Sequence, residues 1–180
     1  MPKFMFRFFS RFDALFSWKA RVVLITLPFA MLSTPATANW VDVSQEANSI
    51  QAITTHSEKP VPGLFDRSAP AELTIRCAQN NTSIALSFEH TYLSDLGDYA
   101  NVTLQLDDGF ETIVELTRGE NPQTLVWPDG RRAVPFLIEA LRANTLQVSL
   151  TSFTDETLTA DFSLDGMSTA IMPVRSACNW

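Results

Sequence analysis

The chain has 180 residues, of which 20 are Asp or Glu and 13 are Lys or Arg, so its formal net charge is −7 at pH 7. Nucleic acids and anionic membrane surfaces attract proteins rich in Lys and Arg. A chain as acidic as this one is therefore predicted to bind neither. Hydrophobic residues make up 46% of the sequence, which predicts a folded core rather than a disordered chain.

Residues 1–38 have the pattern of a secretory signal peptide. A basic segment precedes an apolar run of about 11 residues, VVLITLPFAML, and small residues follow up to Ala38. Roughly 20 apolar residues are needed to cross a bilayer, so this run predicts no stable membrane insertion. Pro28 also argues against an uncleaved anchor. We predict cleavage between Ala38 and Asn39 and a periplasmic mature chain. Its net charge falls to −11, because the leader holds five basic residues and one acidic residue.

The mature chain divides into a weakly patterned start and a strand-rich remainder. Residues 39–71 contain a segment rich in Pro and Gly, EKPVPGLFDRSAP, and are predicted to form an N-terminal strap over the core. From residue 72 onward, the alternation of apolar and polar residues predicts strands. These predicted strands cover residues 72–78, 82–88, 101–109, 111–118, 123–127, 145–150 and 157–164.

Two segments interrupt the strand pattern with helical spacing. In AVPFLIEALRAN, residues 133–144, Pro135 is expected in the first turn and Asn144 at the end. Residues 167–178 predict a C-terminal helix that Pro173 kinks or divides. The order of elements predicts an α+β, mainly β fold, with an antiparallel sheet or sandwich of about seven strands, one packed helix and a short C-terminal helix. The expected organisation is signal peptide 1–38, strap 39–71 and β-rich domain 72–180.

The chain has two cysteines, Cys77 and Cys178, and export would place both in an oxidising compartment. Cys77 shares the inward phase of its predicted strand with Leu73 and Ile75. Cys178 shares one helical face with Met167, Ala170, Ile171 and Val174. Two inward-facing cysteines in an exported chain predict a disulfide that staples the C-terminal helix to the sheet. A reactive or metal-binding pair is the alternative, but neither a C-x-x-C spacing nor a nearby histidine favours it.

One polar loop offers residues for chemistry. His90 is close in sequence to Ser94, Asp95 and Asp98, a set from which a Ser-His-Asp site could be assembled, although no G-x-S-x-G elbow accompanies it. Asp95, Asp98 and Asn101 could instead supply oxygen ligands to a calcium ion, but their spacing differs from that of an EF-hand. We prefer an ordinary solvated loop and predict no catalytic residue, no metal site and no cofactor.

Two other charged pairs are interpreted as structural. Asp107 and Asp108 precede Gly109 between two predicted strands, which is typical of a hairpin turn and favours a turn over a catalytic carboxylate pair. Arg131 and Arg132 follow the turn signal WPDG. They could pair with an acidic partner, but a solvated surface is the preferred interpretation.

Five segments occur in a particular order along the chain: LTIRC, VTLQLDDG, PDGRRAVPFLIEAL, LTADFSLDG and AIMPVRSACNW. Together they resemble the VasI-like family, small exported proteins associated with bacterial type VI secretion. The sharpest elements of the resemblance are Arg76-Cys77, Phe162 with Gly166, and Val174-Arg175 with Cys178 and Trp180. The resemblance covers residues 40–180. It implies a periplasmic accessory protein without catalytic residues, in which the two cysteines pair.

Two classes of function follow. The first is a periplasmic, non-enzymatic accessory or binding protein that contacts envelope protein partners, such as components of a type VI secretion apparatus. The alternative is an exported hydrolase or effector that acts on the cell envelope through the His90 loop. Substitution of His90 distinguishes them, because it would abolish the activity of such an enzyme and leave a binding protein intact.

Overall fold

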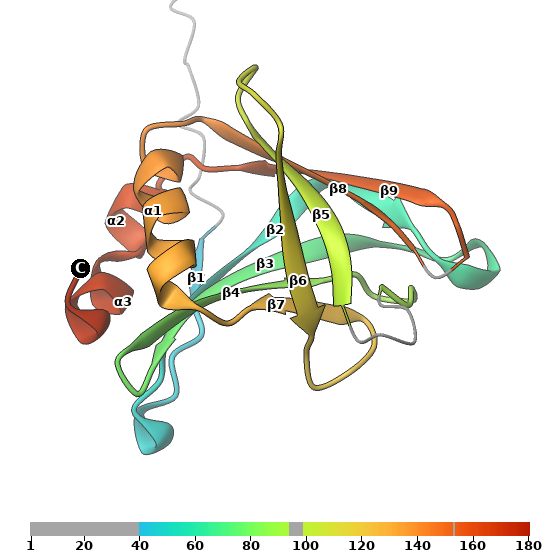
Figure 1. The fold of residues 1–180 in the computed structure, drawn as a ribbon. Helices are drawn as coiled ribbons and strands as arrows, with labels where there is room; N and C mark the ends of the chain where they lie inside the picture. Colours follow the sequence, from blue (N-terminus) through green and yellow to red (C-terminus); the bar gives the residue numbers. More distant parts are fainter. Residues whose placement is uncertain (1–39, 94–98, 153) are drawn as a thin grey trace, which may run out of the picture. The chain divides into compact units, whose positions relative to one another are not determined.

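The computed structural model describes residues 40–93, 99–152 and 154–180, and in these residues one antiparallel sheet of nine strands is accompanied by three short α-helices (Figure 1). The strands are β1 (Val41–Asp42), β2 (Gln51–Pro62), β3 (Ser68–Ala78), β4 (Asn81–Ser87), β5 (Tyr99–Leu106), β6 (Thr112–Arg118), β7 (Thr124–Trp127), β8 (Thr145–Thr151) and β9 (Thr157–Ser163). The helices are α1 (Gly130–Ala140), α2 (Met167–Ala170) and α3 (Met172–Cys178), with 3-10 turns η1 (Glu46–Asn48) and η2 (Leu64–Asp66). The predicted signal peptide, residues 1–38, lies outside the described residues.

The strands follow the order β1-β2-β3-β4-β7-β6-β5-β8-β9 across the sheet. The chain therefore leaves β4, crosses to β5, and returns through β6 and β7 to pair with β4. It then crosses through α1 to β8, which pairs with the other side of β5. β2 and β9 stand near opposite ends of this order, yet they lie against each other. Since no ladder joins them, the sheet is a half-barrel whose ends approach without closing.

The core lies on the concave side of the curled sheet, because inward-facing apolar residues alternate along the strands. Val102 in β5, Val148 in β8 and Phe162 in β9 are fully buried examples. α1 adds Ala133, Leu137 and Ala140, which recur at helical spacing and are all buried. Figure 1 shows the three helices gathered on one side of the sheet, where α1 packs against β4.

The number of strands is nine rather than the seven predicted from the sequence. The difference arises in the segment expected to be a strap, because β1 and β2 extend the sheet there and pair with each other. β2 pairs along nearly its whole length with β3 and buries residues such as Ile53 and Thr55. The seven strands predicted from alternation are all present.

The helices differ from the predictions in their bounds. α1 begins at Gly130 and not near residue 133, because the Asp129 side chain accepts a hydrogen bond from the Arg131 backbone N–H and caps the helix there. Pro135 consequently lies inside the helix and not in its first turn. The C-terminal helix is divided into α2 and α3, and Pro173 occupies the start of α3, where proline is tolerated.

Leu137→Ala is expected to lower the free energy of unfolding by about 2–5 kcal/mol, because it leaves a cavity beneath α1. The neighbouring Ile138 is 43% exposed and serves as the matched control, since Ile138→Ala should cost less than about 1 kcal/mol. Urea denaturation of both variants measures the difference. Equal losses would show that α1 is not inserted into the core as described.

Candidate functional site

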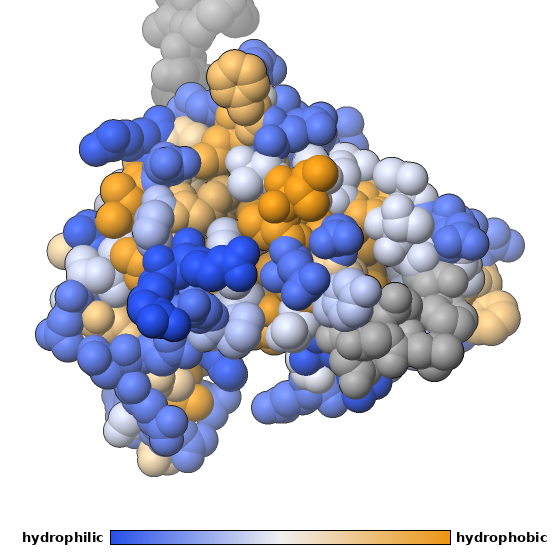
Figure 2. Space-filling view, in the orientation of Figure 1, coloured by the Kyte–Doolittle hydropathy of each residue, from blue (hydrophilic) through white to orange (hydrophobic). Residues whose placement is uncertain are grey.

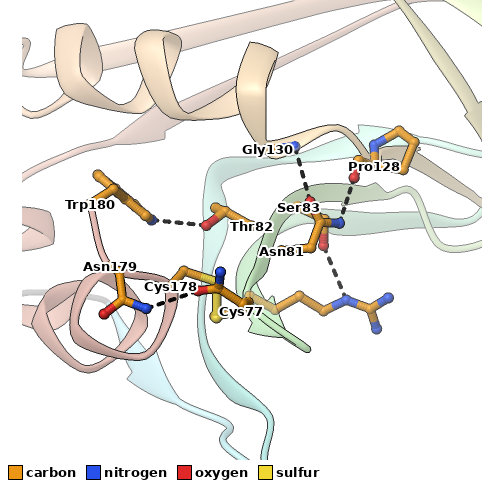
Figure 3. The surroundings of a disulfide bond; sticks show 11 residues. Cys77, Asn81, Thr82, Ser83, Pro128, Gly130, Cys178, Asn179 and Trp180 are labelled. Carbon is orange, nitrogen blue, oxygen red and sulfur yellow. Dashed lines mark hydrogen bonds between the residues drawn. A yellow bond between two sulfur atoms is a disulfide. The ribbon is translucent and has the colours of Figure 1, made fainter.

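The end of the chain is attached to the β3–β4 hairpin near its turn by a disulfide and two hydrogen bonds (Figure 3). Cys77 at the end of β3 is bonded to Cys178 at the end of α3, with 5.8 Å between their Cα atoms. Trp180 Nε1 donates to Thr82 Oγ1 at 2.8 Å, and Asn179 Nδ2 donates to Asn80 Oδ1 at 2.9 Å. We call this group, Cys77, Asn80, Thr82 and residues 178–180, the C-terminal anchor.

Two further side chains extend the C-terminal anchor to its neighbours. Arg175 lies over the Trp180 ring, 5.2 Å from its centroid, and Arg175 Nε donates to the Trp180 backbone oxygen at 3.3 Å. Asn81 Nδ2 donates to the Pro128 oxygen at 2.8 Å, while Asn81 Oδ1 accepts from the Gly130 N–H at 3.2 Å. Asn81 therefore fixes the point at which β7 ends and α1 begins (Figure 3).

A row of polar side chains crosses four neighbouring strands on the outer face of the sheet. His56 in β2 is opposite Glu72 in β3, Glu72 is opposite Ser87 in β4, and Ser87 is opposite Thr124 in β7. This polar row lines a groove of about 370 Å³. Pro70, Glu89, Asn121 and Gln123 complete the lining.

Two pairwise contacts connect side chains within the polar row. His56 Nε2 lies 3.8 Å from Glu72 Oε2, and Ser87 Oγ lies 2.8 Å from Thr124 Oγ1. Two strand spacings, about 10 Å, separate the backbones of His56 and Ser87, and the Ser87 hydroxyl is bonded to Thr124. The groove offers hydroxyl, amide and carboxylate groups to a polar ligand or partner.

His90 lines a separate, smaller hollow with Leu64 and Tyr92, where its backbone passes close to that of Gly63. Its φ is 66°, in the left-handed region, and its carbonyl accepts the Leu64 N–H at 2.9 Å. A Cβ atom at Gly63 would lie 3.0 Å from His90 Cβ, so a larger residue there would have to push His90 aside. His90 Nε2 lies 3.4 Å from Glu89 Oε1.

The proposed partners of His90 fall outside the described residues. Ser94, Asp95 and Asp98 all belong to the segment 94–98, so neither the Ser-His-Asp hypothesis nor the calcium hypothesis is tested. Asn101 is in β5, opposite Glu115 of β6. Within residues 40–93, 99–152 and 154–180, no three His, Cys, Asp or Glu side chains form a group that could hold a metal ion.

Asp107 and Asp108 lie in the β5–β6 turn, as predicted, and the Gly109 N–H donates to the Leu106 oxygen. Asp107 also has a role that the sequence did not indicate. Its Oδ1 accepts the backbone N–H groups of Asn144 and Thr145, both at 2.9 Å, and these bonds hold the pKa of the carboxyl below its usual value. The turn therefore anchors the start of β8.

Arg131 and Arg132 lie on the exposed surface at the start of α1. Arg131 Nε is 3.4 Å from Asp129 Oδ1, and the Arg131 side chain is 92% exposed. So exposed an ion pair contributes little to stability. No helix in the described part of the chain has the length and apolar character needed to cross a membrane.

A family model described as "Type VI secretion system VasI, EvfG, VC_A0118" matches residues 24–180. The chain belongs to this VasI family. No curated protein and no solved structure matches it. The family links the chain to type VI secretion, and this confirms the resemblance seen in the sequence.

Most of the residues that carry the resemblance to VasI proteins meet in one place. Cys77, Cys178 and Trp180 form the C-terminal anchor, and Arg175 packs on Trp180. Arg76, next to Cys77, donates through Nε to Ser83 Oγ at 3.2 Å across the β3–β4 hairpin. In this chain, these residues therefore tie the C-terminal helix to the β3–β4 hairpin.

Replacing both cysteines by serine is expected to lower the free energy of unfolding by about 2–5 kcal/mol, because the bond closes a loop across a sequence separation of 101. Asn179→Ala is the control, since it removes one exposed hydrogen bond of the same anchor and should cost less than about 1 kcal/mol. Chemical denaturation with and without reductant provides the measurement. A wild-type protein insensitive to reductant would contradict the stapling role.

Asp107→Asn is expected to lower the melting temperature at pH 7, because the charged acceptor is lost while the shape is kept. A carboxyl whose pKa is lower in the folded state stabilises the folded protein at pH values above its unfolded-state pKa of 3.8. This stabilisation is lost as the pH falls through the lower folded-state pKa. The melting temperatures of the wild-type protein and of Asp107→Asn should therefore converge at acidic pH. Asp108→Asn is the control and should leave the melting temperature unchanged at both pH values. A constant difference for Asp107→Asn at all pH values would contradict the assignment.

Proposed function

We propose that the chain is a periplasmic, non-enzymatic accessory protein of a type VI secretion apparatus and that it binds an envelope protein partner. The observation that carries this proposal is the VasI family match over residues 24–180. The match supplies the link to type VI secretion, and the compartment and mode of action are inferred from other features.

The periplasmic location is supported by the disulfide and by the leader pattern of residues 1–38. Structural disulfides persist in oxidising compartments and are rare in the reducing cytosol. The Cys77–Cys178 bond is buried at both cysteines, which suits a permanent staple better than a reactive pair.

A binding role is supported by the kind of surface that the fold presents. The curled sheet and the C-terminal anchor hold many exposed groups on regular elements, and rigid elements position binding residues well. The polar row provides one such surface, with hydroxyl and carboxylate groups in register across four strands. Within it, His56 lies beside Glu72, and the Ser87 hydroxyl is hydrogen-bonded to Thr124.

The alternative is an exported hydrolase or effector that acts on the cell envelope. It is supported by His90 beside Glu89, next to a small hollow of about 150 Å³ that Phe65 and Tyr92 help to line. A histidine paired with a carboxylate is a common arrangement for a general base.

The test is to crosslink the tagged protein in its own cells, purify it without reductant and identify bound proteins by mass spectrometry. We expect envelope components of the type VI apparatus, and secretion should fail when the protein is deleted. Recovery of cell-wall fragments alone, with secretion intact in the deletion strain, would overturn the proposal.

His90→Asn separates the accessory protein from the hydrolase. Asparagine tolerates the left-handed backbone at this position, so the variant should fold. An accessory protein should retain secretion and partner recovery, whereas a hydrolase that uses His90 should lose roughly 100-fold or more in activity. His56→Ala is the matched control for His90→Asn, because it replaces a histidine of the polar row that lies outside the His90 site. Loss of secretion in His90→Asn with the partner still bound would favour the hydrolase.

A further inference from the structure

Part of β6 has a strand partner on one side only. β6 pairs with β5 from Thr112 to Thr117, but it pairs with β7 only at Thr117 and Arg118. If the β7 register continued, Glu115 would face Pro128 and Ile113 would face Gly130. Proline has no N–H to donate, and Gly130 already starts α1. β7 therefore cannot extend along β6, and the edge at residues 113–115 has no strand partner among the described residues.

The backbone groups of Ile113 and Glu115 point to this open side. The Gly119 N–H donates to the Thr124 oxygen at 2.7 Å, so the groups of Gly119 face β7. In an antiparallel ladder the direction alternates with each residue, so Thr117, Glu115 and Ile113 face the same way as Gly119. No described residue forms a backbone hydrogen bond there with Ile113 or Glu115. An added strand would find about four backbone donors and acceptors.

The side chains of the same edge are apolar at the centre and acidic at both sides. Ile113 is 71% exposed and lies on the outer face of β6 with Glu115, and the exposed Glu111 lies just before the strand. Neither glutamate has an ion-pair partner among the described residues. Phe110, just before β6, is 99% exposed. Figure 2 shows a hydrophobic area on the face that β6 crosses, bordered by hydrophilic surface.

In the register centred on Ile113, a second copy of the chain is disfavoured at this edge. Two β6 strands paired antiparallel around Ile113 would place Glu111 of one copy opposite Glu115 of the other, and like charges directly opposite are unfavourable. The same pattern favours a strand of opposite charge. A segment with an aliphatic residue opposite Ile113 and a cation two positions away on each side would form two favourable cross-strand pairs.

We propose that the open edge of β6 at Ile113 and Glu115 accepts an extended segment of a partner protein by β-strand addition, and that this segment carries an aliphatic residue flanked at both second neighbours by Lys or Arg. Main-chain hydrogen bonds supply the affinity in this mode of recognition, and alternate side chains supply the specificity. The inference rests on the proposed function in that the partner is an envelope protein, and it adds where and how that partner binds.

The direct test uses two capped peptides, TKTVTKT and its charge-swapped match TETVTET, titrated into the ¹⁵N-labelled mature protein. We expect TKTVTKT to shift the amide signals of Ile113 and Glu115 most, and TETVTET to bind at least about tenfold more weakly. Equal binding of both peptides, or the largest shifts on other strands, would overturn the proposal.

Three variants sharpen the test. Ile113→Pro removes an N–H that faces only the open side, so pairing with β5 should survive while TKTVTKT binding falls at least about tenfold. The double variant Glu111→Lys with Glu115→Lys should reverse the preference between the two peptides. Glu46→Lys with Glu58→Lys changes the net charge equally on other elements and should leave both affinities unchanged. Melting curves verify that each variant folds, and an unreversed preference in the β6 double variant would overturn the proposal.

A photo-crosslinking residue in cells distinguishes this inference from the proposed function. It is placed at position 113, and at position 159 as an exposed control on β9. Capture of an envelope partner from position 113 and not from 159 supports both the accessory function and the β6 site. Capture from 159 alone leaves the accessory function standing and overturns the β6 site. No capture of any secretion component from either position, with TKTVTKT still binding at β6, counts against the accessory function and leaves the edge chemistry supported.

Discussion

The Cys77–Cys178 disulfide is the constraint on which the rest of the fold depends, because six of the nine strands and the three helices lie in the loop that it closes. β4 to β9, α1, α2 and most of α3 are between the two cysteines. The bond joins the end of β3 to the end of the last helix, so the sheet cannot uncurl without moving α3 away from it. Trp180 and Asn179 then add hydrogen bonds to the same hairpin. A single covalent link thus holds the end of the chain against the turn of the β3–β4 hairpin.

Most strands could be predicted from the sequence because their core-facing residues are apolar and alternate. β9 is the clearest example, with Leu158, Ala160 and Phe162 all buried. β2 could not be predicted in this way, since Thr54, Thr55 and Ser57 are buried polar residues and prolines end the segment. Thr54 Oγ1 donates to the Leu73 oxygen and Ser57 Oγ donates to the Lys59 oxygen, whereas the buried Thr55 Oγ1 has no hydrogen-bond partner among the described residues. Buried polar residues of this kind leave no hydrophobic periodicity in the sequence. The cysteine pairing was predictable because both residues occupy inward phases.

The polar row was not predictable, for a different reason. His56, Glu72, Ser87 and Thr124 come from four strands, and their alignment depends on register and on strand order. β7 pairs with β4 only because the chain first crosses to β5 and returns, a route that local patterning does not encode. The role of Asp107 was hidden similarly, since its partners Asn144 and Thr145 are 37 and 38 residues away. Turn chemistry identified the hairpin but not what its carboxylate would bind.

The open edge of β6 and the insertion of α1 have one structural origin. Pro128 ends β7 early, and Asp129 caps α1 immediately afterwards, so the chain leaves the sheet and places Leu137 in the core. The same early end removes the strand that would otherwise cover Ile113 and Glu115. Asn81 holds both sides of this exit, through the Pro128 oxygen and the Gly130 N–H. It is the first residue of β4 and lies between Asn80 and Thr82 of the C-terminal anchor. Asn81, beside the anchor, therefore supports the turn that leaves this part of β6 open. For this reason a partner at the β6 edge would meet a preorganised strand and not one that must first be freed from β7.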